Sequence, residues 1–261
     1  MEYSNILYKK SVPIAILSLN RPEIKNAFTL KMAEDIYQAL KDASSDPAIK
    51  VIIIRGEGNV FSAGGDIKEM SRGKLTSWDM KDYLWNHVQK IPLLLEEIDK
   101  PVIASIDGPA FGGGFGLALA CDLRIASERA TFCATYVRIG LASGDGSAIY
   151  LPRLVGFSRA MDIIFTGRVI EMEEAHGLGL VNRVVSAETL ETESLAYAGE
   201  IARWPEASLK ASKRALYDGL TSDLKGHLDY MSSQLALLSE TREHKKAIKA
   251  LIHKNKFPKD Q

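Results

Sequence analysis

The sequence predicts an α/β fold with a helical C-terminal region, and three features carry this prediction. The β-branched run at 51–54 and the apolar run at 102–106 have the composition of strands buried on both faces of a parallel sheet. Segments with helical periodicity alternate with such strands over most of the chain, and the pattern from 188 to 254 is helical throughout. We therefore expect an α/β core, 1–195, and a helical region, 196–261, that packs beside it or makes oligomer contacts.

The first part of the chain alternates strands and helices in a regular order. A turn at 11–13 separates the first two strands, and Asp46-Pro47 ends the first helix. Pro92 is expected to interrupt the second helix. The expected elements are strands at 6–8 and 14–19, a helix at 30–43, a strand at 51–54, a helix at 78–98 and a strand at 102–106.

After residue 116 the predicted elements are shorter, and then they become helical. Gly156 separates two helices, and Pro205 and Thr221-Ser222 break the helical C-terminal region. The expected elements are a helical stretch at 117–120, strands at 123–126 and 131–132, helices at 147–155 and 158–165, a strand at 181–185 and helices from 188 to 254.

The composition is that of an ordinary globular protein, and it argues against several classes of function. The 261 residues are 46% apolar and 25% charged, and 33 basic residues balance 33 acidic ones. A chain without net charge offers no electrostatic attraction to nucleic acid or to an anionic membrane, so neither is expected as a partner. Two cysteines, Cys121 and Cys133, are too few for a disulfide framework, and no histidines have metal-ligand spacing. With a polar N-terminus and no apolar stretch near the ~20 residues of a membrane span, we expect a cytoplasmic protein without a metal.

Two glycine-containing turns are candidates for chemistry, because each follows a buried strand and opens a helix. The first, 61–70, contains Gly64-Gly65 just before the helical pattern that begins at Asp66. The second, 107–116, contains the glycines 112–114 and 116. Backbone N–H groups at such helix starts can bind an anion, or an oxygen that becomes one. Each turn alone is also compatible with a purely structural role, in which Asp66 is a helix N-cap.

Together, the two turns predict an oxyanion hole. Two N–H groups that converge on one carbonyl oxygen stabilise an enolate or a tetrahedral oxyanion, and the loss of one donor typically costs ~3–4 kcal/mol. Glycine suits this role because no side chain blocks the approach of the ligand. A dinucleotide site is disfavoured, because Leu117 occupies the last glycine position of that fingerprint.

The sequence resembles the crotonase, or enoyl-CoA hydratase/isomerase, superfamily over nearly its whole length. The motifs that carry the resemblance occur in the order and spacing of that family. They are LNRP at 19–22 with NAF at 26–28, FSAGGDIKE at 61–69, KPVIA at 100–104, Gly108 with the glycines 112–114, CDLRIA at 121–126 and LPRLVG at 151–156.

The resemblance implies a crotonase-like spiral of repeated ββα units with a C-terminal helical region that builds a homotrimer or a dimer of trimers. It implies an acyl-coenzyme A thioester as substrate, with coenzyme A as part of the substrate and no permanently bound cofactor. The thioester carbonyl is expected between the amides of Gly65 and Gly113. The coenzyme A moiety is expected against two segments that contain Lys25, Ala27, Ala63, Gly64, Asp66 and Ile67.

Two departures from the family pattern argue against simple hydration. Hydratases of the resembled family use two glutamates, one for the water molecule and one for the proton on the α-carbon. The resemblance places them at two positions that here hold Gly116 and Tyr136. The expected oxyanion hole depends on neither side chain.

Asp145 and Tyr136 are the candidate replacements. Asp145 lies in the loop 142–146, the region where some isomerases and a dehalogenase subgroup of the resembled family place a catalytic aspartate. It is a candidate base or nucleophile, or alternatively a cap of the helix expected from Ser147. Tyr136 is a candidate hydrogen-bond donor to the acyl group or to a transferring proton, or alternatively a pocket wall. His87 is a further acid/base candidate.

We therefore expect an acyl-CoA enzyme that stabilises a thioester enolate, with isomerisation or another proton transfer favoured over crotonyl-CoA hydration. Decarboxylation, thioester hydrolysis and aryl-CoA dehalogenation are alternatives, because they need the oxyanion hole but not two glutamates. A non-catalytic acyl-CoA-binding protein is an alternative of another class. The sequence does not identify the acyl group.

Overall fold

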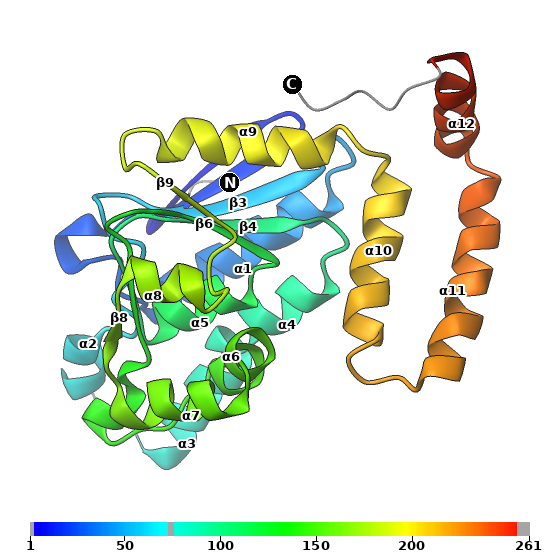
Figure 1. Ribbon diagram of the computed structural model, residues 1–261. Coiled ribbons are helices and arrows are strands. Elements are labelled where there is room, and N and C mark those ends of the chain that lie inside the picture. Colours follow the sequence, from blue (N-terminus) through cyan, green and yellow to red (C-terminus); the bar gives the residue numbers. More distant parts are fainter. Residues whose placement is uncertain (1–2, 73–75, 255–261) are drawn as a thin grey trace. The chain divides into compact units, whose positions relative to one another are not determined.

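The computed structural model describes residues 3–72 and 76–254, and it shows the expected α/β fold (Figure 1). The chain divides into two compact units, Met1–Ile201 and Ala202–Gln261. The expected division after residue 195 falls inside helix α9, Leu190–Ala202, and the assignment of regions on either side of it stays a prediction. In the described part of the chain, no helix is long and apolar enough to cross a membrane.

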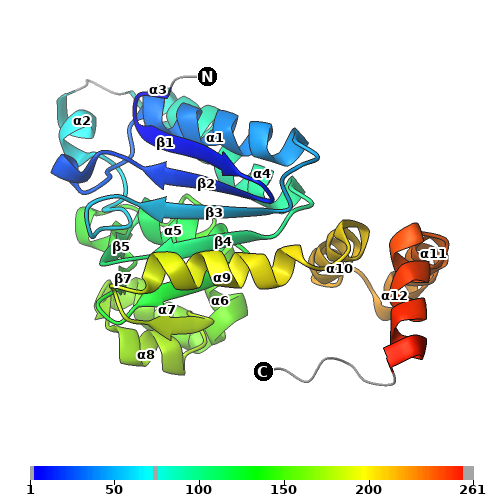
Figure 2. The same ribbon diagram turned by 90° about the horizontal axis from the view of Figure 1, so that it is seen from above.

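A six-stranded sheet forms the centre of the first unit, and Figure 2 shows its first four strands side by side. The pair β1-β2 is antiparallel, and every later strand joins parallel to its neighbour in the order β1-β2-β3-β4-β6-β9. In Figure 1, α9 lies over one face, and α1, α4 and α5 lie on the other. The strands are β1 Ile6–Ser11, β2 Ile14–Leu19, β3 Val51–Gly56, β4 Val102–Ile106, β6 Leu123–Ser127 and β9 Arg183–Val185.

A smaller sheet, in the order β5-β7-β8, carries the chain to the second glycine turn. Its strands are β5 Pro109–Phe111, β7 Thr131–Cys133 and β8 Val169–Ile170. The sequence pattern does not predict β5 or β8, because two or three residues are too few to show a strand period. Phe111 pairs with Cys133, so β5 places the following glycines beside the start of the segment that contains Tyr136.

The helices confirm most of the predicted boundaries, and the predicted break at Pro92 is wrong. The expected helix 78–98 is divided at the π-helical segment η2, Leu84–Val88, and not at Pro92. Pro92 lies in the first turn of α4, where its missing N–H has no intrahelical acceptor to lose. The helices of the first unit are η1 Pro22–Ile24, α1 Leu30–Ser45, α2 Ile67–Arg72, α3 Ser77–Tyr83, η2, α4 Lys90–Glu97, α5 Gly113–Ala120, η3 Thr135–Ile139, α6 Ser147–Val155, α7 Phe157–Thr166, α8 Met172–Gly177 and α9.

The second unit contains three helices within its described residues: α10 Glu206–Asp218, α11 Leu224–Ser239 and α12 Arg242–Lys254. The predicted breaks at Pro205 and Thr221-Ser222 are both found. The break between α11 and α12 is not predicted, because it contains neither glycine nor proline.

The core lies between the main sheet and the helices on one of its faces. Met32, Ile36 and Leu40 of α1 are fully buried, because the period of the helix directs all three toward the sheet. Thr29 caps this helix by accepting a hydrogen bond from Met32 N at 3.2 Å. All residues of α5 after Gly113 are buried, so the helix that begins at the second glycine turn is fixed on every side.

Candidate active site

Hydrogen bonds hold the two glycine turns side by side. Ser62 and Ala110 form a β-bridge, in which Phe111 N donates to Ser62 O at 2.8 Å. Gly64 has a φ of +90°, and a Cβ at this position would lie 2.8 Å from Gly113 N. Only glycine combines this backbone conformation with so close an approach. The first turn therefore lies directly against the start of α5.

The amides of Gly65 and Gly113 donate to no other group in the part of the chain that is described. Phe28 N donates to Gly64 O, and Asp66 N donates to Phe28 O, so Phe28 bonds to the two neighbours of Gly65 in a parallel bridge. The N–H of Gly65 itself therefore points away from Phe28. Gly113 is the first residue of α5, where the N–H has no intrahelical acceptor. Both amides are therefore available to a ligand oxygen, as an oxyanion hole requires.

The segments expected to contact coenzyme A lie beside the first turn. Ala63 N donates to Lys25 O at 2.9 Å, which joins the two segments. Ala27 is buried, whereas Lys25 and Ile67 are exposed. Asp66 accepts a hydrogen bond from Lys68 N at 3.0 Å, so it has the helix-capping role that the sequence allowed. Contact with coenzyme A stays a prediction for Lys25, Ala27, Ala63, Gly64, Asp66 and Ile67.

Asp145 is buried, with 8% of its surface exposed, and four donors on Ser143, Ser147 and Tyr136 surround its carboxylate. The hydroxyl of Ser143 is the most distant, at 3.3 Å from Oδ1. Ser147 donates to Oδ1 twice, from Oγ at 2.7 Å and from the backbone N at 3.1 Å. The hydroxyl of Tyr136 donates to Oδ2. The bond from the Ser147 backbone lies at the start of α6, but the N-cap position there is Gly146, and this bond uses only one of the two carboxylate oxygens. Capping therefore does not explain why the carboxylate faces a cavity.

The carboxylate of Asp145 occupies the space that a side chain at position 116 would fill. A Cβ on Gly116 would lie 2.2 Å from Asp145 Oδ2 and 2.4 Å from Cγ. The resemblance places one glutamate at position 116 and the other at position 136, and here both residues contact the carboxylate of Asp145. The site thus holds one carboxylate at the point where the resemblance implies two.

Tyr136 is buried beneath this carboxylate, and it acts as a neutral donor. Burial raises the pKa of its phenol, and the negative charge of Asp145 raises it further. The hydroxyl also lies 2.8 Å from Gly112 O and 3.1 Å from Ser147 Oγ. Tyr136 therefore joins Asp145 to the start of α5 and is not among the residues that line the cavity described next, and its part in proton transfer stays a prediction.

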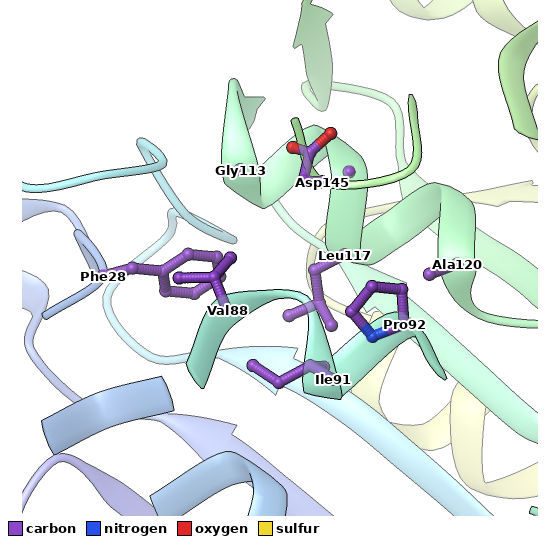
Figure 3. A pocket seen from close by; sticks show the side chains of 9 residues that line it. Phe28, Val88, Ile91, Pro92, Gly113, Leu117, Ala120 and Asp145 are labelled. Carbon is purple, nitrogen blue, oxygen red and sulfur yellow. The ribbon is translucent and has the colours of Figure 1, made fainter. Parts of the chain in front are cut away.

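Asp145 lies at one end of a small, mostly apolar cavity (Figure 3). Its volume is about 20 Å³, which is room for about one water molecule. Figure 3 shows the carboxylate close to Gly113, with apolar side chains around the rest of the space. The lining residues are Phe28, Val88, Ile91, Pro92, Gly113, Gly116, Leu117, Ala120 and Asp145.

Two polar residues that sequence reasoning missed support this site. Ser147 holds Asp145 as described above, and its position two residues after an aspartate is the local signal that could have identified it. Gln89 follows the π-helical segment, and its Nε2 donates to Gly144 O at 2.6 Å, so it ties the loop of Asp145 to α4. Nothing in the sequence near Gln89 indicates this contact.

His87 is not placed for the acid/base role considered for it. It does not line the cavity, and its Nδ1 lies 3.6 Å from Glu34 Oε1 on α1. Among the described residues, no group of three or more His, Cys, Asp or Glu side chains is arranged to hold a metal ion.

Comparisons with known proteins agree with the resemblance. The family model for enoyl-CoA hydratase/isomerase matches residues 9–261. A crotonyl-CoA hydratase of Syntrophomonas wolfei subsp. wolfei is 35% identical over 257 residues, which are 98% of each chain. A trans-2-decenoyl-acyl-carrier-protein isomerase of Streptococcus mutans is 32% identical over 98% of each chain.

A third relative and a solved structure complete the comparison. A 4-chlorobenzoyl coenzyme A dehalogenase of an Arthrobacter species is 39% identical over 193 residues, 73% of this chain and 68% of the dehalogenase. A crystal structure of an enoyl-CoA hydratase subunit from Geobacillus kaustophilus covers 100% of this chain and 99% of its own, with a TM-score of 0.91 and 31% identity. The crotonase fold is thereby confirmed.

Proposed function

The chain belongs to the enoyl-CoA hydratase/isomerase family, and on that premise we propose that it moves the double bond of an enoyl thioester by proton transfer through Asp145. One observation carries the proposal: a single buried carboxylate lies against Gly116, within contact of Tyr136 and beside Gly113. A relative with an isomerase name supports the reaction class. The acyl carrier of the substrate is coenzyme A, which enters with the substrate.

The thioester carbonyl binds between the amides of Gly65 and Gly113. These N–H groups belong to rigid turns, so they are oriented before the substrate arrives. As charge develops on the oxygen, both hydrogen bonds strengthen, which lowers the barrier to enolate formation. The coenzyme A portion then extends past Lys25 and the exposed side chain of Ile67.

Asp145 moves one proton between two carbon atoms of the substrate. Its carboxylate takes the proton from the α-carbon of a 3-enoyl thioester, and the electron pair of the broken C–H bond spreads into a dienolate. The resulting carboxylic acid then returns the proton to the γ-carbon, which gives the 2-enoyl thioester and restores the carboxylate. No water or other co-reactant is consumed, so one acid/base group is enough.

Hydration makes a different demand on the site. One group must deprotonate water while a second handles the α-carbon proton. Neither Gly116 nor Tyr136 supplies a second carboxylate, and the cavity around Asp145 is otherwise apolar. We therefore expect isomerisation to be faster than hydration.

The wall formed by η2 and α4 must move when a substrate enters. The cavity is far smaller than an acyl chain, and Val88, Ile91 and Pro92 of this wall line it. π-Helical segments often occur at functional sites. The hydrogen bond from Gln89 to Gly144 keeps this wall joined to the loop of Asp145.

The test compares wild type, Asp145→Asn and a control, Asp162→Asn, on 3-enoyl and 2-enoyl thioesters of four and ten carbons. Asp162 lies on α7 with 54% of its side chain exposed, and it does not line the cavity. We expect wild type and D162N to form the conjugated 2-enoyl product faster than they hydrate it. General acid–base catalysis typically contributes ~10²–10⁴-fold, so D145N should lose at least ~10²-fold in kcat while it still binds thioester. Equal rates for D145N and wild type, or hydration that exceeds isomerisation, would overturn the proposal.

Aryl-CoA dehalogenation is a second candidate, favoured by the dehalogenase relative and by the same carboxylate. In this reaction an Asp145 oxygen bonds to the ring carbon, the carbon–chlorine bond breaks and chloride leaves. Water then hydrolyses the aryl ester and regenerates Asp145. Release of chloride from 4-chlorobenzoyl-CoA, without isomerisation of any enoyl thioester, would establish this candidate over the first.

A further inference from the structure

We propose that the Tyr136 hydroxyl is a relay that strengthens the Gly113 amide as an oxyanion donor when Asp145 takes a proton. This inference rests on the proposed function of Asp145 as a base. It adds a positioning and electrostatic role for Tyr136 that the proton transfer itself does not require.

The geometry gives the single proton of the phenol competing acceptors. The hydroxyl contacts Asp145 Oδ2, and it lies 2.8 Å from Gly112 O. Ser147 Oγ is a third neighbour at 3.1 Å, but its own proton is directed to Asp145 Oδ1 at 2.7 Å. A phenol has one O–H, so it can donate to the carboxylate or to the Gly112 carbonyl, but not to both at full strength.

The protonation state of Asp145 determines which of the two acceptors receives the hydrogen bond from the phenol. An ionised carboxylate is a much stronger acceptor than a neutral carbonyl, so the phenol donates to Asp145 in the resting enzyme. After Asp145 takes the substrate proton, it is a neutral acid, and that advantage is lost. Gly112 O already accepts from Gly116 N at 2.9 Å, and its second lone pair is available to Tyr136.

Gly112 O and Gly113 N belong to the same peptide group, which connects this change to the oxyanion hole. A hydrogen bond donated to a peptide oxygen polarises the group and makes its N–H a stronger donor. The enolate and the protonated Asp145 arise in the same step. The relay therefore strengthens the hydrogen bond from Gly113 when the negative charge appears on the substrate oxygen.

Ser147 keeps the carboxyl group in place while the phenol changes partner. Both of its hydrogen bonds go to Oδ1, the oxygen that Tyr136 does not contact. Loss of the Tyr136 bond thus leaves Asp145 held against Gly116. Ser147→Ala is therefore the comparison variant: it removes the bond to Oδ1 and the hydroxyl 3.1 Å from the phenol, but it keeps both Tyr136 and its acceptor Gly112 O.

The experiment measures the carbonyl stretching frequency of a bound saturated acyl-CoA labelled with ¹³C at the thioester carbon. Infrared difference spectra are recorded for wild type, Asp145→Asn, Tyr136→Phe and the double variant. The asparagine amide donates to the phenol oxygen, so D145N mimics protonated Asp145. We expect a lower frequency in D145N than in wild type, and a shift less than half as large when Phe replaces Tyr136. In the S147A background the shift should persist in full.

An equal D145N shift with Tyr136 and with Phe would overturn the relay, because the shift would then reflect only the removed charge. Incorporation of 3-fluorotyrosine at position 136, which makes the hydroxyl a stronger donor, should enlarge the D145N shift, and an unchanged shift would also overturn it. These outcomes all require a bound thioester. A wild-type protein that binds no acyl-CoA would instead refute the proposed function, and the relay with it.

Discussion

Substitution of Gly116 by alanine tests whether Asp145 is fixed where the site requires it. The new Cβ would lie 2.2 Å from Asp145 Oδ2, whereas ordinary contacts begin near 3.4 Å, so one of the two groups must move by about 1 Å. The backbone of α5 cannot provide this movement, because Gly114 is packed so closely on Ser62 that a Cβ there would lie 2.4 Å from Ser62 O. The Asp145 carboxylate must therefore shift and lose hydrogen bonds.

The expected effect on activity is larger than the effect on stability. A displacement of ~1 Å in a catalytic group can lower the rate ~10²-fold. Alanine gains up to ~1 kcal/mol over glycine inside a helix, but overpacking costs ~1–3 kcal/mol, so a net loss of about 1 kcal/mol and a fall in Tm of about 2–4 °C are expected. Turnover on the thioester panel and thermal unfolding measure the two effects.

Gly199→Ala is the matched control, since Gly199 lies inside α9 and an added Cβ would meet nothing within 4 Å. We expect this variant to keep wild-type activity and to gain up to ~1 kcal/mol in stability. If Gly116→Ala behaved in the same way, with full activity and a raised Tm, then the carboxylate of Asp145 would not be held against α5.

Three further predictions concern stability and titration. The Arg129 guanidinium holds the pKa of Asp107 below its usual range, so ionised Asp107 stabilises the fold above about pH 4, and this contribution is lost as pH falls through the lowered pKa. In urea unfolding, Asp107→Asn should therefore cost about 1 kcal/mol at pH 7 and progressively less as pH falls below about 4, and a cost that does not change with pH would contradict this. Buried Arg124 donates to three backbone carbonyls, two of them at the end of α5. Arg124→Met should therefore lower the free energy of unfolding in urea by about 3 kcal/mol or more, and a loss under 1 kcal/mol would contradict this. Burial raises the pKa of Tyr136, so this residue should stay protonated up to about pH 11. The tyrosinate absorbance of Tyr136→Phe should therefore match that of wild type up to that pH. One additional tyrosine that titrates near pH 10 in wild type would contradict the raised pKa.

The sequence predicts those helices and strands whose own residues show a clear composition or period. β3 and β4 are apolar runs that only a buried strand explains, and the face of α1 follows from its period. β5 and β8 are too short for such a signal, and they form only because the small sheet pairs them with β7. The π-helical break in the helix 77–97 also depends on packing, and no residue near the break indicates it in the sequence.

The sequence likewise predicts only part of the candidate site. The glycine turns are visible in the sequence, and their hydrogen-bonded contact follows from the pairing of the two loops. The placement of Asp145 over Gly116 joins residues 29 positions apart, and it depends on how α6 packs on α5. The sequence identifies both residues as departures or replacements, but it contains nothing that shows them in contact.

The central claim is that Asp145 exchanges a proton with the α-carbon of a thioester held by two backbone amides. Hydrogen–deuterium exchange at the α-carbon of saturated butyryl-CoA and decanoyl-CoA in D₂O tests it without any need to know the final product. Mass spectrometry should show deuterium incorporation catalysed by the wild type and by Asp162→Asn, and a rate at least ~10²-fold lower for Asp145→Asn. A wild-type protein that binds these thioesters without exchange, or a D145N variant that exchanges at the wild-type rate, would contradict it.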